Sequence, residues 1–329
     1  MTTPLREGNR GCGAPAGGPI TWLSRACRQA GGLHNGAVRL TIVGFGLIGG
    51  SVARALRELD RSTAHAWRIT AWSRTRGSVD QGLHDGVVDA APDSLEAALR
   101  DAELVLLAAP PLTCLDLLDH LAGPLRSALG DATLTDAVST KAQIVTRADM
   151  SALHFVGGHP MAGRESSGYA AAVADLFVGR PWVTVPGANA ALVDSQRVRS
   201  LIQACGAVEV PMTAEAHDSA VAAISHMPLV VSAALVEAVA GRAWATRSDW
   251  PAARDLAATG WAGMTRLARG EPSMGAGIVA TNPAAISARL RDVRAVVDEW
   301  LAELESPNGP DFEWLQERFA AARDQLEKG

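Results

Sequence analysis

From Val38 onward, short apolar runs alternate with longer amphipathic stretches along the chain. Short apolar runs bounded by Gly, Pro or Asp are typical of buried strands, and the stretches between them have room for crossover helices. The alternation therefore predicts an α/β fold built on a doubly wound parallel sheet. The expected strands are Val38–Val43, Arg68–Trp72, Leu104–Ala108, Thr133–Asp136, His154–Val156 and Trp182–Val185.

After Pro186 the pattern changes, because apolar residues recur mostly at helical spacing. One short run, Ala207–Val210, is compatible with an added edge strand. The division predicts a sheet domain over residues 37–187 and an all-helical domain over residues 188–329, whose apolar surplus suits association into a homodimer. The expected helices are His217–Ala240, Ala252–Ala268, Pro283–Leu304 and Phe312–Leu326.

Composition narrows the class of protein. The net charge of −5 and the absence of any Lys/Arg run argue against a nucleic-acid partner. No apolar stretch reaches the length of about 20 residues that spans a bilayer, so no membrane partner is expected. The four cysteines contain no C-x-x-C pair, which argues against a metal site and a disulfide framework. A reducing cytoplasm is the expected location.

Residues 1–36 are rich in Gly and Pro and show no sustained period. We expect a disordered N-terminal arm there, and an upstream translation start would explain the segment equally well. Its arginines outnumber the single acid, Glu7, so a transit peptide is an alternative, whereas Arg25 and Arg28 interrupt any apolar core of a secretory signal.

The first predicted strand leads directly into Gly44-Phe45-Gly46-Leu47-Ile48-Gly49-Gly50-Ser51. In this G-x-G-x-x-G pattern, Gly44 suits the tight turn, Gly46 the close approach of a pyrophosphate and Gly49 tight helix packing. The motif alone also fits a plain glycine turn. Its strand–loop–helix setting favours a Rossmann-type dinucleotide-binding domain, with Gly44, Gly46, Leu47, Ile48 and Gly49 at the cofactor.

The choice of cofactor is expected to depend on the end of the second strand. An NAD enzyme usually carries an acid there for the ribose hydroxyls, but this chain has Ser73 followed by Arg74. A guanidinium can bind a 2′-phosphate, so NADP is favoured over NAD. The alternative is that Arg74 and Arg76 are solvated loop arginines.

His159 is the candidate catalytic base. It follows the predicted strand His154–Val156, so it is expected at the carboxyl edge of the sheet, where open α/β sheets bind ligands. An imidazole with an ordinary pKa of about 6.5 is a neutral base at neutral pH. Ser139, in the segment that follows the predicted strand Thr133–Asp136 on the same edge, is expected to hydrogen-bond a substrate hydroxyl and orient it towards His159.

Three further side chains are candidate substrate ligands. Lys141 is one of only two lysines beside 28 arginines, so a compact ammonium is expected to matter there. His226 interrupts an apolar helix, where a satisfied core histidine is the alternative interpretation. Arg266 is expected within an apolar helical face, where it would need an anion such as a substrate carboxylate.

Taken together, these motifs resemble the prephenate dehydrogenase and arogenate dehydrogenase family of tyrosine biosynthesis. The resemblance covers residues 38–300 and implies an oxidative decarboxylation on a CH–CH donor with hydride transfer to NAD(P). It implies that His159 and Ser139 act on the ring hydroxyl, that Glu165 shapes access, that His226 lies near the substrate and that Arg266 clamps the ring carboxylate. The matching residues are Gly44–Ser51, Asp136-x-x-Ser139-x-Lys141, Gly158–Glu165, His226-x-Pro228 and Thr265-Arg266.

Several functions stay open at this point. Prephenate and arogenate differ only in a keto or amino acid side chain, and the motifs do not separate them. A second alternative is another two-domain hydroxy-acid dehydrogenase, although such enzymes commonly use a lysine base that the helical part lacks before Lys328. A third is a nucleotide sensor without catalysis, which the joint presence of His159, Ser139 and Arg266 disfavours.

Overall fold

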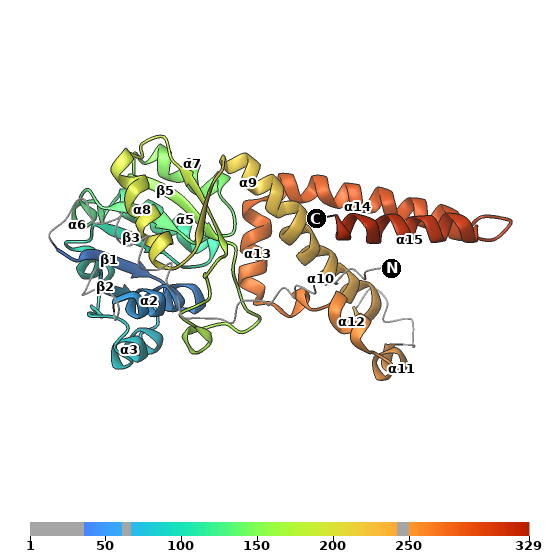
Figure 1. The fold of residues 1–329 in the computed structure, drawn as a ribbon, viewed down its shortest axis with the longest axis horizontal. Helices are drawn as coiled ribbons and strands as arrows, with labels where there is room; N and C mark the ends of the chain where they lie inside the picture. Colours follow the sequence, from blue (N-terminus) through green and yellow to red (C-terminus); the bar gives the residue numbers. More distant parts are fainter. Residues whose placement is uncertain (1–35, 61–66, 242–249, 329) are drawn as a thin grey trace, which may run out of the picture. The chain divides into compact units, whose positions relative to one another are not determined.

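The computed structural model describes residues 36–60, 67–241 and 250–328. Apart from Gly36, the arm expected over residues 1–36 lies outside these ranges. The described residues contain a seven-stranded sheet of order β2-β1-β3-β4-β5-β6-β7, with helices on both of its faces (Figure 1). The strands are β1 Val38–Val43, β2 Trp67–Trp72, β3 Leu104–Leu107, β4 Thr133–Asp136, β5 Phe155–Pro160, β6 Pro181–Pro186 and β7 Val208–Pro211.

The doubly wound fold is confirmed, with one exception to its parallel pairing. β5 and β6 are antiparallel, with His159 opposite Val183, whereas all other neighbouring strands are parallel. A parallel return needs a crossover, usually a helix. The connection from β5 to β6 contains only the short 3-10 helix η1, Tyr169–Ala171, so the chain turns back instead of crossing over.

Two hydrophobic clusters hold the layers together. On one face, α2 and α8 supply Val52, Leu56, Val198 and Leu201, and on the other face α5 and α7 supply Leu118 and Ile144. Because both faces are covered, a central strand such as β3 is buried at all four of its positions. The helices are α2 Leu47–Asp60, α3 Gly77–His84, α4 Leu95–Leu99, α5 Pro111–Ala122, α6 Arg126–Leu129, α7 Ala142–Met150 and α8 Leu192–Ala204.

Strand pairing and core packing of the sheet continue beyond residue 187. α8 packs on the sheet through Val198, Leu201 and Ile202, and β7 is hydrogen-bonded to β6. Both elements follow residue 188, where the sequence places the start of the helical domain. We propose a boundary between Pro211 and Ala214, because strand pairing and core packing belong to the sheet up to that point.

The remaining elements are helical, as the sequence predicts. The single helix expected over Ala252–Ala268 is wrong, because Ala258 takes an extended conformation with φ −123° and separates α11 from α12. The elements are α9 Ala214–Val221, the π-helix η2 Ala222–His226, α10 Met227–Ala240, α11 Trp250–Asp255, α12 Thr259–Met264, η4 Leu267–Arg269, α13 Pro272–Thr281, α14 Pro283–Leu304 and α15 Phe312–Glu327.

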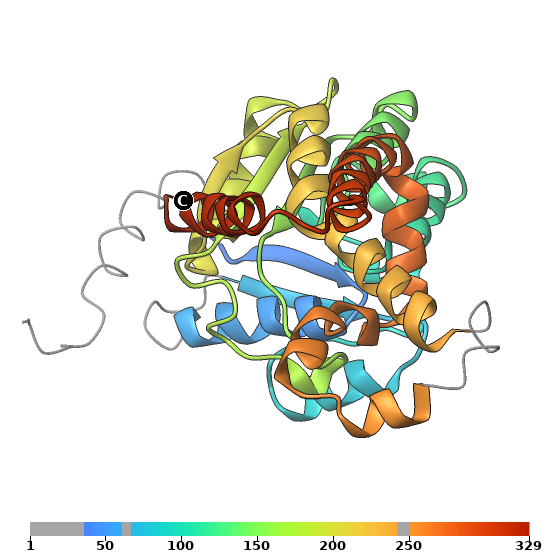
Figure 2. The ribbon, with the colours of Figure 1, turned by 90° about the vertical axis from the view of Figure 1, so that its right-hand side faces the viewer.

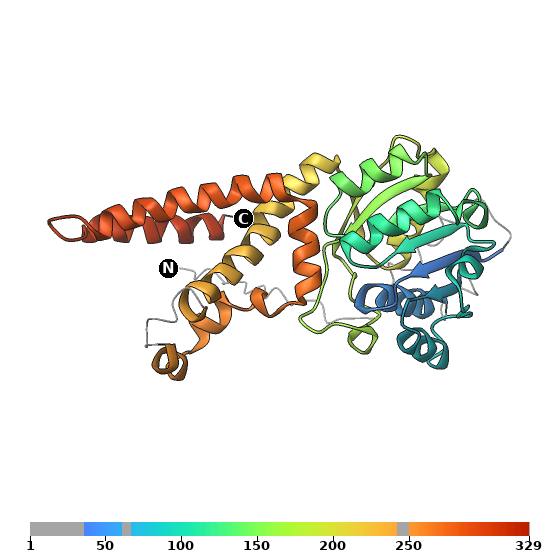
Figure 3. The same cartoon turned by 180° about the vertical axis from the view of Figure 1, so that it is seen from behind.

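α14 and α15 form a helical hairpin whose turn faces the viewer in Figure 2. Near the turn, the rings of Trp300 and Trp314 lie 5.2 Å apart and Arg318 forms an ion pair with Glu299 at 2.9 Å. Further along α15, apolar side chains are exposed, Phe319 at 67% and Leu326 at 85%. The hairpin, seen from behind in Figure 3, therefore carries apolar side chains that the other described residues leave exposed.

One helical run in the described residues changes the expectation about membranes. Ala214–Ala240, which comprises α9, η2 and α10, is long and apolar enough to cross a membrane by length and composition, with a mean hydropathy of 1.8 over its most apolar window. The sequence pattern predicts a helix over His217–Ala240 but no apolar stretch long enough to span a bilayer. A single such helix is weak evidence, and its polar residues His217, Asp218 and His226 are buried against the rest of the protein.

Candidate active site

The glycine loop has the backbone that a dinucleotide pyrophosphate requires. Gly44 has φ +97°, and a Cβ atom there would lie 2.5 Å from the Ala108 carbonyl oxygen. A Cβ at Gly49 would lie 2.3 Å from the Gly44 carbonyl oxygen, so the start of α2 approaches the loop as only glycine permits. Gly46 faces open space, and α2 begins at the next residue, Leu47. The loop therefore fits a nicotinamide dinucleotide at a helix N-terminus.

The two arginines after β2 have different surroundings. Arg76 is held by Asp80 at 3.0 Å, by Asp93 and by the Ala91 carbonyl oxygen at 3.1 Å. Arg74 is exposed and makes no hydrogen bond or ion pair with any other described residue. Ser73 before it is half-buried. Arg76 is therefore a loop arginine held by neighbouring carboxylates. Arg74 is the arginine whose guanidinium is available to a ligand.

His159 lies within β5, at the same carboxyl edge as the glycine loop. The parallel registers that join β1 to β3, β3 to β4 and β4 to β5 place Gly44, Asp136 and His159 at that edge. The strand is held there by Asp136, whose carboxylate accepts a 2.9 Å hydrogen bond from the Gly158 N–H. A Cβ atom on Gly158 would lie 2.4 Å from the Asp136 carbonyl oxygen, so glycine is needed for this approach.

A chain of buried polar groups extends from His159 into the helical part. Nδ1 of His159 lies 2.8 Å from Nε2 of His217, and Nδ1 of His217 lies 2.8 Å from a carboxylate oxygen of Asp218. The three residues are 9%, 1% and 4% exposed. Because water is nearly excluded, each of these hydrogen bonds is stronger than it would be at a surface.

The surroundings of His159 favour its neutral form. Burial, followed by the charge of Lys141 and the neighbouring rings of His217 and His226, holds the pKa of His159 well below its ordinary value of 6.5. The group is therefore unprotonated at neutral pH and able to accept a proton.

Lys141 is not placed as a substrate ligand. Its side chain is fully buried, and its ammonium group forms an ion pair with the Asp136 carboxylate, which is also fully buried. Asp136 in turn accepts the N–H groups of Val138 and Gly158. The expected contact with substrate is therefore corrected to a structural ion pair between Lys141 and Asp136.

His226 is held at the end of the π-helix η2, and such short π-helical turns frequently occur at functional sites. The ring is 1% exposed, and burial lowers its pKa from 6.5 to about 4. Asn282 faces its Nδ1 at 3.3 Å, while Nε2 has no hydrogen-bond partner among the described residues. A buried ring nitrogen left in this way is suited to a bound ligand.

Ser139 lies beside these histidines. Its backbone faces the His226 ring, and its half-buried hydroxyl makes no hydrogen bond to another described residue. The neighbouring Thr140 hydroxyl is instead engaged with Thr281 of α13 at 2.8 Å. Of the two hydroxyls, that of Ser139 is free to meet a substrate.

Arg266 differs from its expected environment. It is not enclosed in an apolar helical face but lies between α12 and η4, with its side chain 54% exposed. Its guanidinium meets the Glu165 carboxylate at 3.4 Å, and Glu165 is itself 73% exposed. The pair joins the loop after β5 to the helical part. Because the Arg266 side chain is exposed to solvent, its charge does not require a buried anion as a partner.

The sequence interpretation missed His217, Asp218 and Asn282. A signal was present, because an adjacent His and Asp interrupt an otherwise apolar helical stretch. Helical periodicity alone cannot show that their partner is a strand residue 58 positions earlier in the chain.

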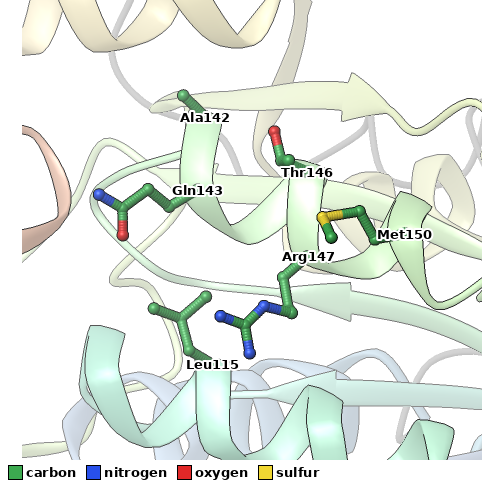
Figure 4. Close-up of a pocket in the computed structure, with 6 residues that line it drawn as sticks. All are labelled: Leu115, Ala142, Gln143, Thr146, Arg147 and Met150. Carbon is green, nitrogen blue, oxygen red and sulfur yellow. The ribbon is translucent and has the colours of Figure 1, made fainter.

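A pocket of about 360 Å³ lies between α5 and α7 (Figure 4). It contains no candidate site residue, and its Arg147 is already paired with Asp119 at 2.6 Å. We assign it no function. Its lining residues are Leu115, Ala142, Gln143, Thr146, Arg147 and Met150.

Two family models match successive parts of the chain. Residues 52–210 match the model described as prephenate dehydrogenase, nucleotide-binding domain, and residues 213–317 match prephenate dehydrogenase, dimerization domain. The prephenate dehydrogenase of Bacillus subtilis (strain 168) is 31% identical over 293 residues, which cover 87% of this chain and 74% of that protein.

Solved structures show the same likeness. Arogenate dehydrogenase from Synechocystis is 30% identical with a TM-score of 0.70, and the match covers 88% of this chain and 100% of that chain. Prephenate dehydrogenase from A. aeolicus, solved with hydroxyphenyl propionate and NAD+, has a TM-score of 0.75 at 23% identity and covers 89% and 98% of the two chains. At that identity the second likeness concerns the fold alone.

Proposed function

This chain belongs to the prephenate dehydrogenase family, and we propose that it converts prephenate to 4-hydroxyphenylpyruvate in tyrosine biosynthesis. The observation that carries the proposal is the buried, neutral His159 at the sheet edge that also holds the glycine cradle. A proton acceptor on the same sheet edge as the expected binding loop of a hydride acceptor supports this proposal. Such a pair suits the oxidation of a hydroxyl-bearing carbon.

Each site residue has a proposed role in the reaction. When bound, the oxidised nicotinamide supplies the hydride acceptor. Ser139 orients the ring hydroxyl, His159 accepts its proton as hydride leaves the same carbon, and loss of the ring carboxylate as CO₂ makes the ring aromatic. Arg266 binds a substrate carboxylate, and Glu165 competes for Arg266 in the absence of substrate. His226 presents its free Nε2 to the substrate.

The reaction is tested by following reduced-cofactor formation with prephenate or arogenate against NAD or NADP. Turnover with prephenate is the expected result. Absence of turnover in all four combinations would contradict the proposal and favour another hydroxy-acid substrate or a sensor.

Arogenate is the alternative substrate, and one observation favours it. The solved Synechocystis relative, at 30% identity, is an arogenate dehydrogenase. Faster turnover of arogenate than of prephenate would assign the chain to that activity and make tyrosine its direct product.

NADP is the proposed cofactor, and Arg74→Ala tests that choice. Loss of a charge-assisted hydrogen bond, worth about 1.5–3 kcal/mol, is expected to raise the KM for NADP about 10- to 100-fold while the KM for NAD stays within about twofold. Arg76→Ala is the matched control, because Asp80 and Asp93 already hold that guanidinium. Equal effects on both cofactors would place the 2′-phosphate contact elsewhere.

Arg266→Ala tests the carboxylate clamp. The expected result is a KM for prephenate about 10- to 100-fold higher, with little change in kcat, because the lost bond acts in the ground state as well as in the transition state. Arg269→Ala, an exposed arginine of the same segment, is the control. An unchanged KM in Arg266→Ala would move the clamp to another residue.

We also propose a homodimer built on the helical part. The match to a dimerization domain and the exposed apolar side chains of α14 and α15 support it. A cytoplasmic location is proposed as well, since Cys114 and Cys205 are buried free thiols of the kind that a reducing compartment maintains.

A further inference from the structure

The hydrogen-bond chain behind His159 has a direction. The Asp218 carboxylate only accepts hydrogen bonds, so the Nδ1 of His217, 2.8 Å away, must carry the proton. In a neutral His217, Nε2 is then an acceptor. Because this acceptor lies 2.8 Å from His159 Nδ1, the His159 proton resides on Nδ1 and its Nε2 holds the free electron pair.

Asp218 is held as a carboxylate by contacts on several sides. Its two oxygens accept the N–H groups of Lys141 at 2.7 Å and Ala142 at 2.9 Å, at the N-terminus of α7. These bonds, together with that from His217, lower the pKa of Asp218 against the opposing effect of burial. The group is thus a fixed negative charge, tied to the sheet domain although it belongs to α9.

A second histidine in the site, His226, is held with its proton on the other ring nitrogen. The side-chain amide nitrogen of Asn282 donates to the Asp218 carbonyl oxygen at 2.9 Å, which identifies it as the N–H end of the amide. The same nitrogen faces His226 Nδ1 at 3.3 Å, so that ring nitrogen is an acceptor and Nε2 carries the proton. The site therefore distinguishes an accepting ring, His159, from a donating ring, His226.

We propose that His217 and Asp218 are positioning residues that hold His159 with its proton on Nδ1, so that Nε2 is the atom that accepts the substrate hydroxyl proton. This inference rests on the proposed function. The proton moves from the hydroxyl oxygen to Nε2 as the C–H electron pair leaves as hydride. His159 then carries protons on both nitrogens, and the fixed charge of Asp218 stabilises that imidazolium through His217.

A purely structural role is the competing explanation, since Asp218 also joins α9 to α7. His217→Gln separates the two explanations, because it leaves both bonds from α7 to Asp218 in place. A glutamine carbonyl can still accept from His159 Nδ1, whereas His217→Phe removes the acceptor. We expect kcat to fall in the order wild type, His217→Gln, His217→Phe, with the last lower by about 10²–10⁴-fold and cofactor Kd unchanged.

His154→Gln is the matched control. His154 faces Asp194 at 3.1 Å in a second His–Asp pair, which lies away from the candidate active site. Its replacement is expected to leave kcat within about twofold of the wild type. Equal kcat losses in His217→Gln and His217→Phe, paralleled by equal losses of thermal stability, would show that the pair is structural only.

The pH profile of kcat gives a readout that a structural role does not move. Lys141, His217 and His226 face His159, with Asp136 and Asp218 behind them, and His159 titrates below pH 6.5. Activity of the wild type should therefore be level above pH 6.5 and fall in more acid solution. In Asp218→Asn a negative charge that favours imidazolium is lost, so the acid limb should move to still lower pH. An unmoved limb would contradict the proposed charge stabilisation.

The position of the proton can be read without any substrate. Nitrogen-15 spectra of the histidine-labelled full-length protein, with His159 assigned from the His159→Asn spectrum, report which ring nitrogen carries hydrogen. Protonated Nδ1 and bare Nε2 in the wild type are expected, with loss of this preference in His217→Phe. A proton on Nε2 would overturn the inference, whatever substrate the enzyme proves to use, so its failure is distinct from that of the proposed function.

Discussion

His159→Asn is expected to lower kcat by about 10²–10⁴-fold, the range for loss of a general base. Asparagine can still donate a hydrogen bond towards His217, so the polar chain behind the site is maintained. It offers no nitrogen able to take up a proton at neutral pH. Cofactor affinity should stay unchanged, because no hydrogen bond links His159 to the glycine loop in the described residues.

Steady-state kinetics with prephenate, together with a titration of cofactor binding, check this result. His120→Asn is a suitable control, since His120 is exposed on α5 and its ring lies 2.7 Å from the Asp116 carbonyl oxygen of its own helix. Turnover of His159→Asn within a factor of about three of the wild type would remove His159 from its proposed role.

Lys141→Met should destabilise the protein by about 3–5 kcal/mol, the effect of removing one partner from a buried ion pair. Asp136 would keep its hydrogen bonds from Val138 and Gly158 but would lose its counter-ion at a position with no access to water. Equilibrium unfolding in urea measures the change.

The exposed pair Arg100–Glu96, at 3.1 Å on the surface of α4, provides the comparison. Arg100→Met is expected to change the free energy of unfolding by less than about 0.5 kcal/mol, because water screens such pairs. Similar effects of the two substitutions would mean that the buried pair contributes no more than a surface pair. Lys141→Arg should also destabilise, because a larger side chain must then be accommodated at a fully buried position.

Much of the sheet could be predicted because strand signals are local. The boundaries of β1 and β4 agree with the predicted runs, since short apolar segments between turn residues require little knowledge of their neighbours. The direction of β6 could not be predicted in this way. It depends on whether residues 161–180 form a crossover helix, and the structure has only the 3-10 helix η1 in that connection.

Some features of the candidate site also follow from local sequence, and others depend on tertiary packing. The glycine loop and the position of His159 at a strand end follow from residue type and spacing, which are properties of short segments. The environment of Lys141 and Arg266 does not. The sequence predicts a substrate contact for Lys141 and an apolar helical face around Arg266, yet Lys141 is fully buried against Asp136 and Arg266 is exposed beside Glu165. Burial is a property of the packed elements around a residue.

The sequence by itself thus determined the family, the doubly wound fold, the nucleotide cradle and the identity of the proposed base. Only the tertiary structure decided what surrounds that base. His159 meets His217 across 58 positions of chain, and Lys141 N–H meets Asp218 across 77. Such contacts form when α9 packs against the N-terminus of α7. Their strength comes from the exclusion of water there. No local pattern encodes that meeting, because it results from the packing of whole elements.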